Sequence, residues 1–208
     1  NPTTASYTDS GLTPSTNYRY EVTAVDAAGN ESAKSAAVTT TTTAGAGGGG
    51  TVQAQLLADR TIDPASTAPA STRLKVDAAS PQNDMLMKFA VPTSCTSVAA
   101  ASLRLTVGSG STDPSVRGGD FYATDPASNP DWSEASVVWN TAPARTGTPV
   151  SLTTGVALNT SYDINVTSLV PAAGGTFTIR GTSTSADGAG YFSKEGSTTS
   201  GPRLTLTC

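Results

Sequence analysis

Apolar and polar side chains alternate in short runs along most of the chain, and clusters of Gly, Pro, Asn and Ser separate these runs. A period of two predicts β-strands with one buried face, and no helical period competes with it. From residue 51 onward about ten such runs follow one another, which favours an all-β fold, a jelly-roll-like two-sheet β-sandwich. The runs lie at 51–57, 74–76, 85–91, 101–107, 120–124, 150–152, 161–166, 176–180, 190–195 and 203–207.

The N-terminal segment has a separate pattern, in which one alternating run is followed by an Ala-Gly-Asn turn and a second run. Within it, Leu12-x-Pro14-x-x-x-Tyr18 resembles the tyrosine corner of fibronectin type III domains. The resemblance covers only residues 1–43, which implies the C-terminal strands of an incomplete, partial fibronectin type III β-sandwich. Half a sandwich cannot bury its own core. We therefore expect this part to be disordered, packed on the second domain, or paired with strands of another chain.

A run of threonines followed by Ala-Gly-Ala-Gly-Gly-Gly-Gly at 44–50 is the clearest boundary in the chain. Gly-rich segments of this kind are flexible linkers. We therefore predict three parts, which are the fibronectin-type strands at 1–43, the linker at 44–50 and the β-sandwich at 51–208.

Composition narrows the class of protein. Thr, Ser, Ala and Gly dominate while charged residues make up 13% of the chain, which is typical of secreted β-proteins. The net charge is −4 and the charges are scattered, so the sequence lacks the basic stripe of nucleic-acid-binding proteins. No run approaches the roughly 20 apolar residues of a membrane span, so we expect no membrane insertion, and a secretory leader would lie upstream of Asn1.

The only two cysteines are Cys95 and Cys208. In a Thr- and Ser-rich chain they predict one disulfide formed in an oxidising, extracellular compartment. Such a bridge would fix a terminal strand that otherwise frays. Two free buried thiols are the alternative.

The chain contains no histidine, which removes the usual general base and every Ser-His or Cys-His arrangement. A carboxylate pair for glycoside hydrolysis remains as an alternative, with Asp131 and Glu134 beside the two tryptophans as the nearest candidates. We interpret Glu134 instead as a residue that hydrogen-bonds backbone groups and fixes its loop. We predict that the chain is not an enzyme.

Several stretches, and the order in which they follow one another along the chain, resemble the DNRLRE-type domain family, whose members include the family-96 carbohydrate-binding modules. The most specific is Trp-Ser-Glu-Ala-Ser-Val-Val-Trp-Asn-Thr-Ala-Pro at 132–143. The resemblance implies a jelly-roll-like β-sandwich of the kind appended to secreted polysaccharide-acting enzymes or cell-surface proteins, with glycan binding in some members. The other stretches are Met-Leu-Met-Lys-Phe at 85–89 with Pro92, Ala-x-Leu-x-Leu at 101–105, 163–170, and Phe-Ser-Lys-Glu at 192–195 with Pro202-x-Leu204.

The same resemblance suggests binding residues. Four basic side chains lie in or near strands where glycan binders of the family place such groups, and together they would hydrogen-bond the hydroxyls or carboxylates of a polymer; solvated strand faces are the alternative. Trp132 lies in a polar loop, where it either caps the loop or faces a ligand, whereas Trp139 is expected in the core. The predicted ligand-binding residues are Arg73, Lys75, Lys88, Lys194 and Trp132, with Asp59 and Tyr191 as weaker additions.

A calcium site is one interpretation of four aspartates in a loop-rich stretch, because hard oxygen ligands on loops suit that ion. They are Asp113, Asp120, Asp125 and Asp131. Solvated turn aspartates are the alternative interpretation, and there is no EF-hand spacing.

The sequence as a whole predicts a secreted, non-catalytic carbohydrate-binding module whose partner is a polysaccharide. The second hypothesis is a structural or adhesive extracellular unit that assembles with other copies of the same chain by strand pairing.

Overall fold

The computed structural model describes residues 8–9, 12, 16–42, 50–65, 72–172 and 174–208. The chain divides into two compact units, Asn1–Gly48 and Gly49–Cys208. Pro14 of the expected tyrosine corner and all but the last residue of the expected linker lie outside the described residues. The division into domains at 1–43, 44–50 and 51–208 stays a prediction.

The N-terminal unit contains a two-stranded antiparallel sheet. Strand β1 (Asn17–Tyr20) pairs with β2 (Val38–Thr41), and a single bridge between Val25 and Glu31 continues the hairpin. Gly29 sits at the turn with a φ of 90°, a left-handed conformation that a glycine adopts without strain. The strand, turn and strand that the pattern predicted are present here, whereas the relation to a fibronectin type III domain stays a prediction.

The C-terminal unit is built on one eight-stranded sheet in the order β8-β7-β10-β5-β3-β12-β6-β9, with a separate two-stranded sheet of β11 and β4. Two short 3-10 helices, Trp139–Thr141 and Thr167–Leu169, interrupt the connections. The strands are β3 (Thr51–Ile62), β4 (Arg73–Val76), β5 (Asp84–Ala90), β6 (Ala100–Thr106), β7 (Gly119–Thr124), β8 (Arg145–Leu152), β9 (Ser161–Asn165), β10 (Thr176–Thr182), β11 (Ala189–Phe192) and β12 (Arg203–Thr207).

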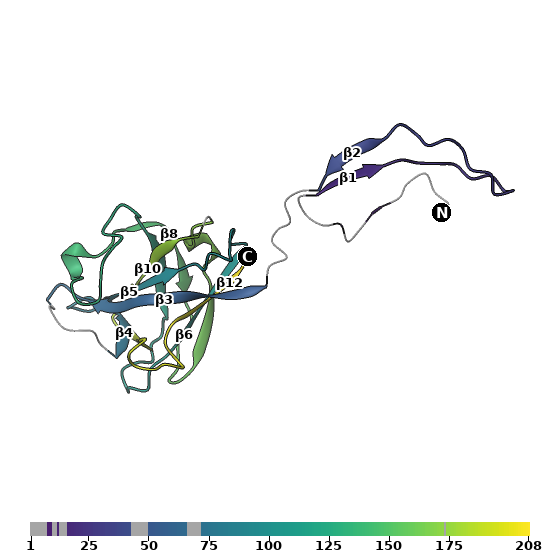
Figure 1. The fold of residues 1–208 in the computed structure, drawn as a ribbon. Helices are drawn as coiled ribbons and strands as arrows, with labels where there is room; N and C mark the ends of the chain where they lie inside the picture. The colour runs from purple at the N-terminus through teal and green to yellow at the C-terminus, as the bar shows by residue number, and fades with distance from the viewer. Residues whose placement is uncertain (1–7, 10–11, 13–15, 43–49, 66–71, 173) are drawn as a thin grey trace. The chain divides into compact units, whose positions relative to one another are not determined.

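The long strand β3 joins the two layers of the unit (Figure 1). Its first residues, 51–54, pair with β12, and the remainder pairs with β5. The register shifts between Leu56 and Ala58, within the pairing with β5, and such a bulge bends a strand. The sheet therefore curls over on itself, and the prediction of an all-β sandwich is confirmed.

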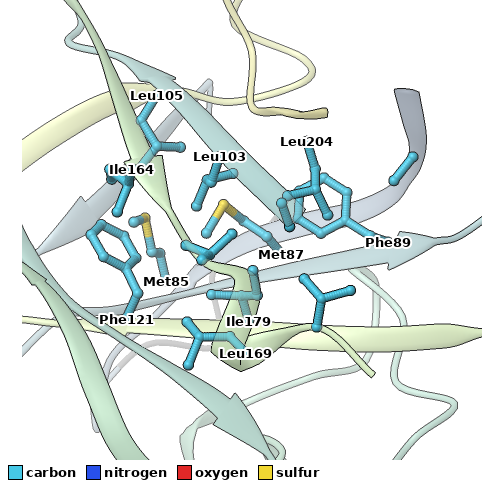
Figure 2. Close-up of a cluster of buried hydrophobic side chains, with 14 of the residues drawn as sticks. Met85, Met87, Phe89, Leu103, Leu105, Phe121, Ile164, Leu169, Ile179 and Leu204 are labelled. Carbon is cyan, nitrogen blue, oxygen red and sulfur yellow. The ribbon is translucent and has the colours of Figure 1, made fainter. Parts of the chain in front are cut away.

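Alternation along the strands fills the space between the layers. Met85, Met87 and Phe89 of β5 point into this core, and Leu103 and Leu105 of β6 enter it from the other layer (Figure 2). All five side chains are fully buried. A strand with one face against such a core needs apolar residues at every second position, which is the pattern that the sequence shows.

The opposite face of β5 is also covered. Leu86, next to Met85 and Met87, belongs to a second apolar cluster with Ala58, Trp132 and Val137. Residues 131–143 fold over this face after β7. They include the stretch from Trp132 to Pro143, which we call the tryptophan block. The block therefore acts as a cover on the outside of the sandwich, and it places its polar side chains beside β3 and β5.

One disulfide joins Cys95 to Cys208, with the two Cα atoms 5.2 Å apart. It ties the residue after β12 to the loop that leaves β5. The predicted pairing is confirmed.

Candidate functional site

The tryptophan block packs over a lysine of β5, Lys88. The Trp132 indole N–H donates a 2.9 Å hydrogen bond to Thr178 Oγ1, and the side chain is only 3% exposed. Lys88 Nζ lies 4.9 Å from the Trp132 ring centroid and donates to the Trp132 backbone carbonyl. This arrangement is a cation–π contact. Burial lowers the pKa of Lys88, and the nearby charge of Asp131 opposes that shift.

Glu134 fixes the block to β3. Its Oε1 accepts a 2.9 Å hydrogen bond from the backbone N–H of Asp59, and its backbone carbonyl accepts a hydrogen bond from the Arg60 guanidinium. The interpretation of Glu134 as a residue that bonds backbone groups to hold its loop is confirmed.

Lys194, which follows β11, meets Glu134 from a third segment. Its Nζ lies 2.6 Å from Glu134 Oε1 and 3.3 Å from Glu195 Oε1, and it donates to the Leu57 carbonyl at 3.2 Å. Partial burial opposes the charge of this ammonium, but the hydrogen bonds to the two carboxylates outweigh it and raise the pKa of Lys194. Lys194 therefore stays protonated and its side chain is still 37% exposed.

Asp59 lies beneath these charges. Its Oδ2 accepts a 2.8 Å hydrogen bond from the Lys194 backbone N–H, and the residue is 1% exposed. Burial, together with the negative charges of Glu195 and Glu134, raises the pKa of Asp59 to about 7, although the Lys194 hydrogen bond works in the other direction. Burial and nearby negative charge both disfavour the ionised form of a carboxyl group.

Two open hollows of about 420 Å³ each flank Lys194. We call them the first hollow, beside the tryptophan block, and the second hollow, beside the start of β12. The first is lined by Leu57, Ala58, Lys88, Trp132, Ser133, Glu134, Ala135 and Lys194. The second is lined by Gln53, Ala54, Leu56, Lys194, Ser197, Thr198, Gly201, Pro202 and Arg203.

Within the described residues, no helix is both long and apolar enough to cross a membrane.

A comparison with family models matches residues 58–208 to carbohydrate-binding module family 96. The chain belongs to this family. Modules of this type bind carbohydrate and are non-catalytic, in agreement with the interpretation of the chain as a non-enzyme. A search of curated proteins found no match.

The family 96 match contains every residue of the first hollow except Leu57. Of the five predicted ligand-binding residues, the structure brings Lys88, Lys194 and Trp132 together there. Trp132 forms part of the wall and leaves no open ring face for a sugar to stack on. From the sequence, Trp132 was expected either to cap its loop or to face a ligand, and an open ring face would have been needed for the second role.

Arg73 and Lys75 line neither hollow. Arg73 forms an ion pair with the buried Asp113, and Lys75 Nζ lies 2.8 Å from Asp77 Oδ2. Arg73 and Lys75 therefore do not share a hollow with Lys88 and Lys194, and a role for them in binding stays a prediction. Local carboxylates hold both on β4, outside the hollows.

The two tryptophans exchange their expected places. Trp139, expected in the core, is half-buried at the edge of the second apolar cluster, with the Arg180 guanidinium 5.3 Å from its ring centroid. Trp132 is the buried one. The block forms a cover in which the first tryptophan points down to β10 and the second remains at the edge.

The four candidate calcium aspartates are not gathered into one site. Asp113 and Asp120 are buried and pair with arginines. Asp125 accepts a hydrogen bond within its own turn, and Asp131 is exposed. Asp125 and Asp131 thus fit the alternative of solvated turn aspartates, whereas Asp113 and Asp120 are buried in ion pairs, which neither interpretation anticipated.

A different carboxylate group is present among the described residues. One oxygen each from Asp59, Glu134 and Glu195 lies within 4.8 Å of the others. Sequence reasoning considered Asp59 and Glu134 singly, and it did not connect them. The residues are separated by tens of positions, so only the fold brings them together.

Proposed function

We propose that the C-terminal unit is a non-catalytic module that binds a polysaccharide in the two hollows that flank Lys194. The observation that carries the proposal is that Lys88, Glu134 and Lys194, from three separate segments, border one hollow. Ammonium groups donate to hydroxyls and carboxylates of a glycan, and a carboxylate accepts from its hydroxyls. Membership of family 96 supports the same class of ligand.

The shape of the surface supports an extended ligand. The two hollows have Lys194 in common and lie along β3, from Gln53 to Ala58. Small-molecule sites are usually enclosed and bury most of their ligand. A surface of two open hollows suits successive units of a polymer better than a compact molecule.

The described residues of the hollows offer no open aromatic face, since Trp132 is buried. Binding would therefore depend on hydrogen bonds and charge, with limited apolar contact from Leu57 and Pro202. Interactions between exposed charges weaken with salt. We expect affinity for an anionic glycan to fall as the ionic strength rises.

We also propose that the protein works outside the cell. The support is the disulfide between Cys95 and Cys208, because such bonds persist in oxidising compartments and are rare in the cytosol of most organisms.

The test is a panel of neutral and acidic polysaccharides in affinity gels, followed by calorimetry on any that retard the protein. Lys194→Met removes the charge and keeps most of the side chain's length, so affinity should fall by about tenfold or more. Arg104→Met is the matched control, because Arg104 is an exposed cation paired with Asp163 and lines neither hollow. Lack of binding to the whole panel, or equal losses in the two variants, would contradict the proposal.

A second candidate function is self-association through the N-terminal unit. Three valines of that unit are largely exposed, namely Val22 at 70%, Val25 at 50% and Val38 at 66%. Exposed apolar residues on a two-stranded sheet favour pairing with strands of another chain. Light scattering after size exclusion should then show oligomers that grow with concentration and that weaken in the Val22→Ser and Val38→Ser double variant. Val116→Ser, at an equally exposed valine of the C-terminal unit, should leave them unchanged.

A further inference from the structure

We infer that Asp59 and Glu195 share one proton up to neutral pH, and that its release weakens the binding of an anionic glycan in the first hollow. The shared proton is independent of the proposed function, whereas the effect on binding rests on it. The two residues come from β3 and from the turn after β11.

A hydrogen bond between two acidic side chains requires the proton. The side chains of Asp59 and Glu195 are hydrogen-bonded to each other. An ionised carboxylate only accepts hydrogen bonds, so this bond exists only while one of the two groups carries a hydrogen. The backbone N–H of Lys194 donates to Asp59 Oδ2 at 2.8 Å and holds the Asp59 carboxyl group in place.

Burial decides which residue carries the proton. Asp59 is 1% exposed, whereas the Glu195 side chain is 34% exposed. Burial is the main cause that raises the pKa of Asp59 to about 7. Burial also acts on Glu195, but a hydrogen bond from its own backbone N–H and the contacts with Lys194 outweigh it and lower the pKa of Glu195. The proton therefore lies on Asp59, and Glu195 accepts it in the hydrogen bond.

The other charged groups around this pair come from several segments. Glu134 of the tryptophan block adds negative charge, and the Lys194 ammonium contacts both glutamates. Arg60, next along β3, donates to the Glu134 carbonyl, and Lys88 of β5 lines the first hollow. Cations on the strands beside β3 bond elsewhere, Arg73 and Lys75 to Asp113 and Asp77, and Arg203 to the Thr199 carbonyl.

Release of the proton changes the charge beside the first hollow. Asp59 then adds one negative charge, and its bond to Glu195 is lost because neither group can donate. Two carboxylates with oxygens within 4.8 Å repel each other, and Glu195 is the one with access to solvent. The Lys194 ammonium, which borders both hollows, is drawn toward the new buried charge. A glycan carboxylate in the first hollow would meet a more negative surface and a less available ammonium.

The sequence makes this change easy to detect. The chain has no histidine, the side chain that ordinarily changes charge near neutral pH. Asp59 has a usual pKa of 3.8, so the unfolded chain has lost this proton above about pH 4 while the folded unit keeps it up to about pH 7. Stability from this group therefore falls as the pH rises through that window and is constant above it.

The first arm of the experiment is urea unfolding of the full chain between pH 5.5 and 8.5, which needs no glycan. Linkage predicts that the unfolding equilibrium constant in water rises roughly 30-fold over this range. Asp59→Asn imitates the protonated form, because its amide can donate to Glu195 and its carbonyl can accept from Lys194. Its stability should stay nearly constant. The α-amino group also titrates in this range, and it is present in both proteins.

Glu195→Gln is a second variant, at a more accessible position. Its amide can donate to an ionised Asp59, so the step in stability should move to lower pH. Asp163→Asn is the matched control, because Asp163 is an exposed carboxylate paired with Arg104 and lies outside the carboxylate group. It should keep the pH dependence of the parent. The shared proton is refuted if Asp59→Asn has the same pH dependence as the parent, or if Glu195→Gln leaves the step in place.

The second arm is calorimetry at pH 5.5 and 8.5 with the acidic polysaccharide that binds most tightly in the affinity gels. Affinity of the parent should fall about threefold or more, because a charge added within several ångströms of the ligand has that effect even at the dielectric constant of water. Asp59→Asn should bind equally at both pH values. Equal affinities of the parent, together with a step in its stability, would overturn the effect on binding alone. Lack of binding to every polysaccharide would contradict the proposed function and this effect together, while the first arm still decides the shared proton.

Discussion

The backbone N–H of Asp59 donates a 2.9 Å hydrogen bond to Glu134 Oε1, across 75 positions of sequence. This bond attaches the cover of residues 131–143 to the long strand. Because Lys194 Nζ shares the same oxygen, one side chain holds together three segments of the site.

Replacing Glu134 should release the cover. Glu134→Ala leaves the Asp59 N–H without its acceptor, and the loss of a buried hydrogen bond costs about 1–3 kcal/mol. Glu134→Gln keeps a carbonyl oxygen that can accept and should lose less. Chemical denaturation of both variants measures the difference, and equal stabilities would show that the bond contributes nothing.

Trp132 should be the more important of the two tryptophans for stability. Trp132→Ala removes a buried side chain and its 2.9 Å bond to Thr178, so the free energy of unfolding should fall by about 3–5 kcal/mol. Trp139→Ala should cost clearly less, because that side chain is half-buried at the edge of the cluster. Denaturant titrations of the two variants decide this, and the opposite order would contradict the structural assignment.

The disulfide should contribute strongly to stability. It closes a loop of 113 residues, for which chain entropy in the unfolded state corresponds to about 4–5 kcal/mol. Reduction, or the double change Cys95→Ser and Cys208→Ser, should therefore lower the unfolding temperature markedly. Calorimetry with and without reductant measures the effect. Comparison with the double variant separates the loss of the bond from any effect of the reductant, and an unchanged transition would refute the estimate.

Tyr191 should make the unit sensitive to alkali. Its hydroxyl donates to the Gly118 carbonyl at 2.6 Å in the core, and burial raises the pKa of Tyr191 above its usual value of 10. The folded state then keeps a proton that the unfolded chain releases. Stability from this group is full below pH 10, roughly, and falls as the pH rises above it.

Absorbance of tyrosinate against pH measures this effect. One tyrosine should ionise only as the protein unfolds, and Tyr191→Phe should remove that late step. If all the tyrosines of Tyr191→Phe and of the parent titrate together near their usual pKa, the prediction fails.

The sequence predicted the fold well where one face of a strand is buried. The alternation at 101–107 corresponds to β6, because Leu103 and Leu105 face the core and Arg104 faces solvent. The run at 85–91 also became a strand, but its pattern did not reveal that both faces are covered. Lys88 sits on the covered outer face, under Trp132, and a lysine there was easily assigned to an open surface.

The site was harder to predict because its residues come from distant segments, and because other basic residues of the prediction pair with carboxylates elsewhere. Lys75 was expected to lie beside Lys194, but its ammonium forms an ion pair with Asp77, two positions along the chain. Asp113, forty positions from Arg73, holds that guanidinium instead. Motif positions show which residues a family uses, but they do not show which of them a curled sheet brings to one hollow.

Strand β3 pairs at one end with β12, so Thr51 lies opposite Thr207 in the same sheet. The first strand of the unit cannot complete its hydrogen bonds until the last strand has been synthesised, and β6 also pairs with that last strand. Contacts of such long sequence separation slow folding. A growing chain would have to remain unfolded until residue 207 is free of the ribosome, and truncation by one strand should prevent folding of the entire unit rather than trim its edge.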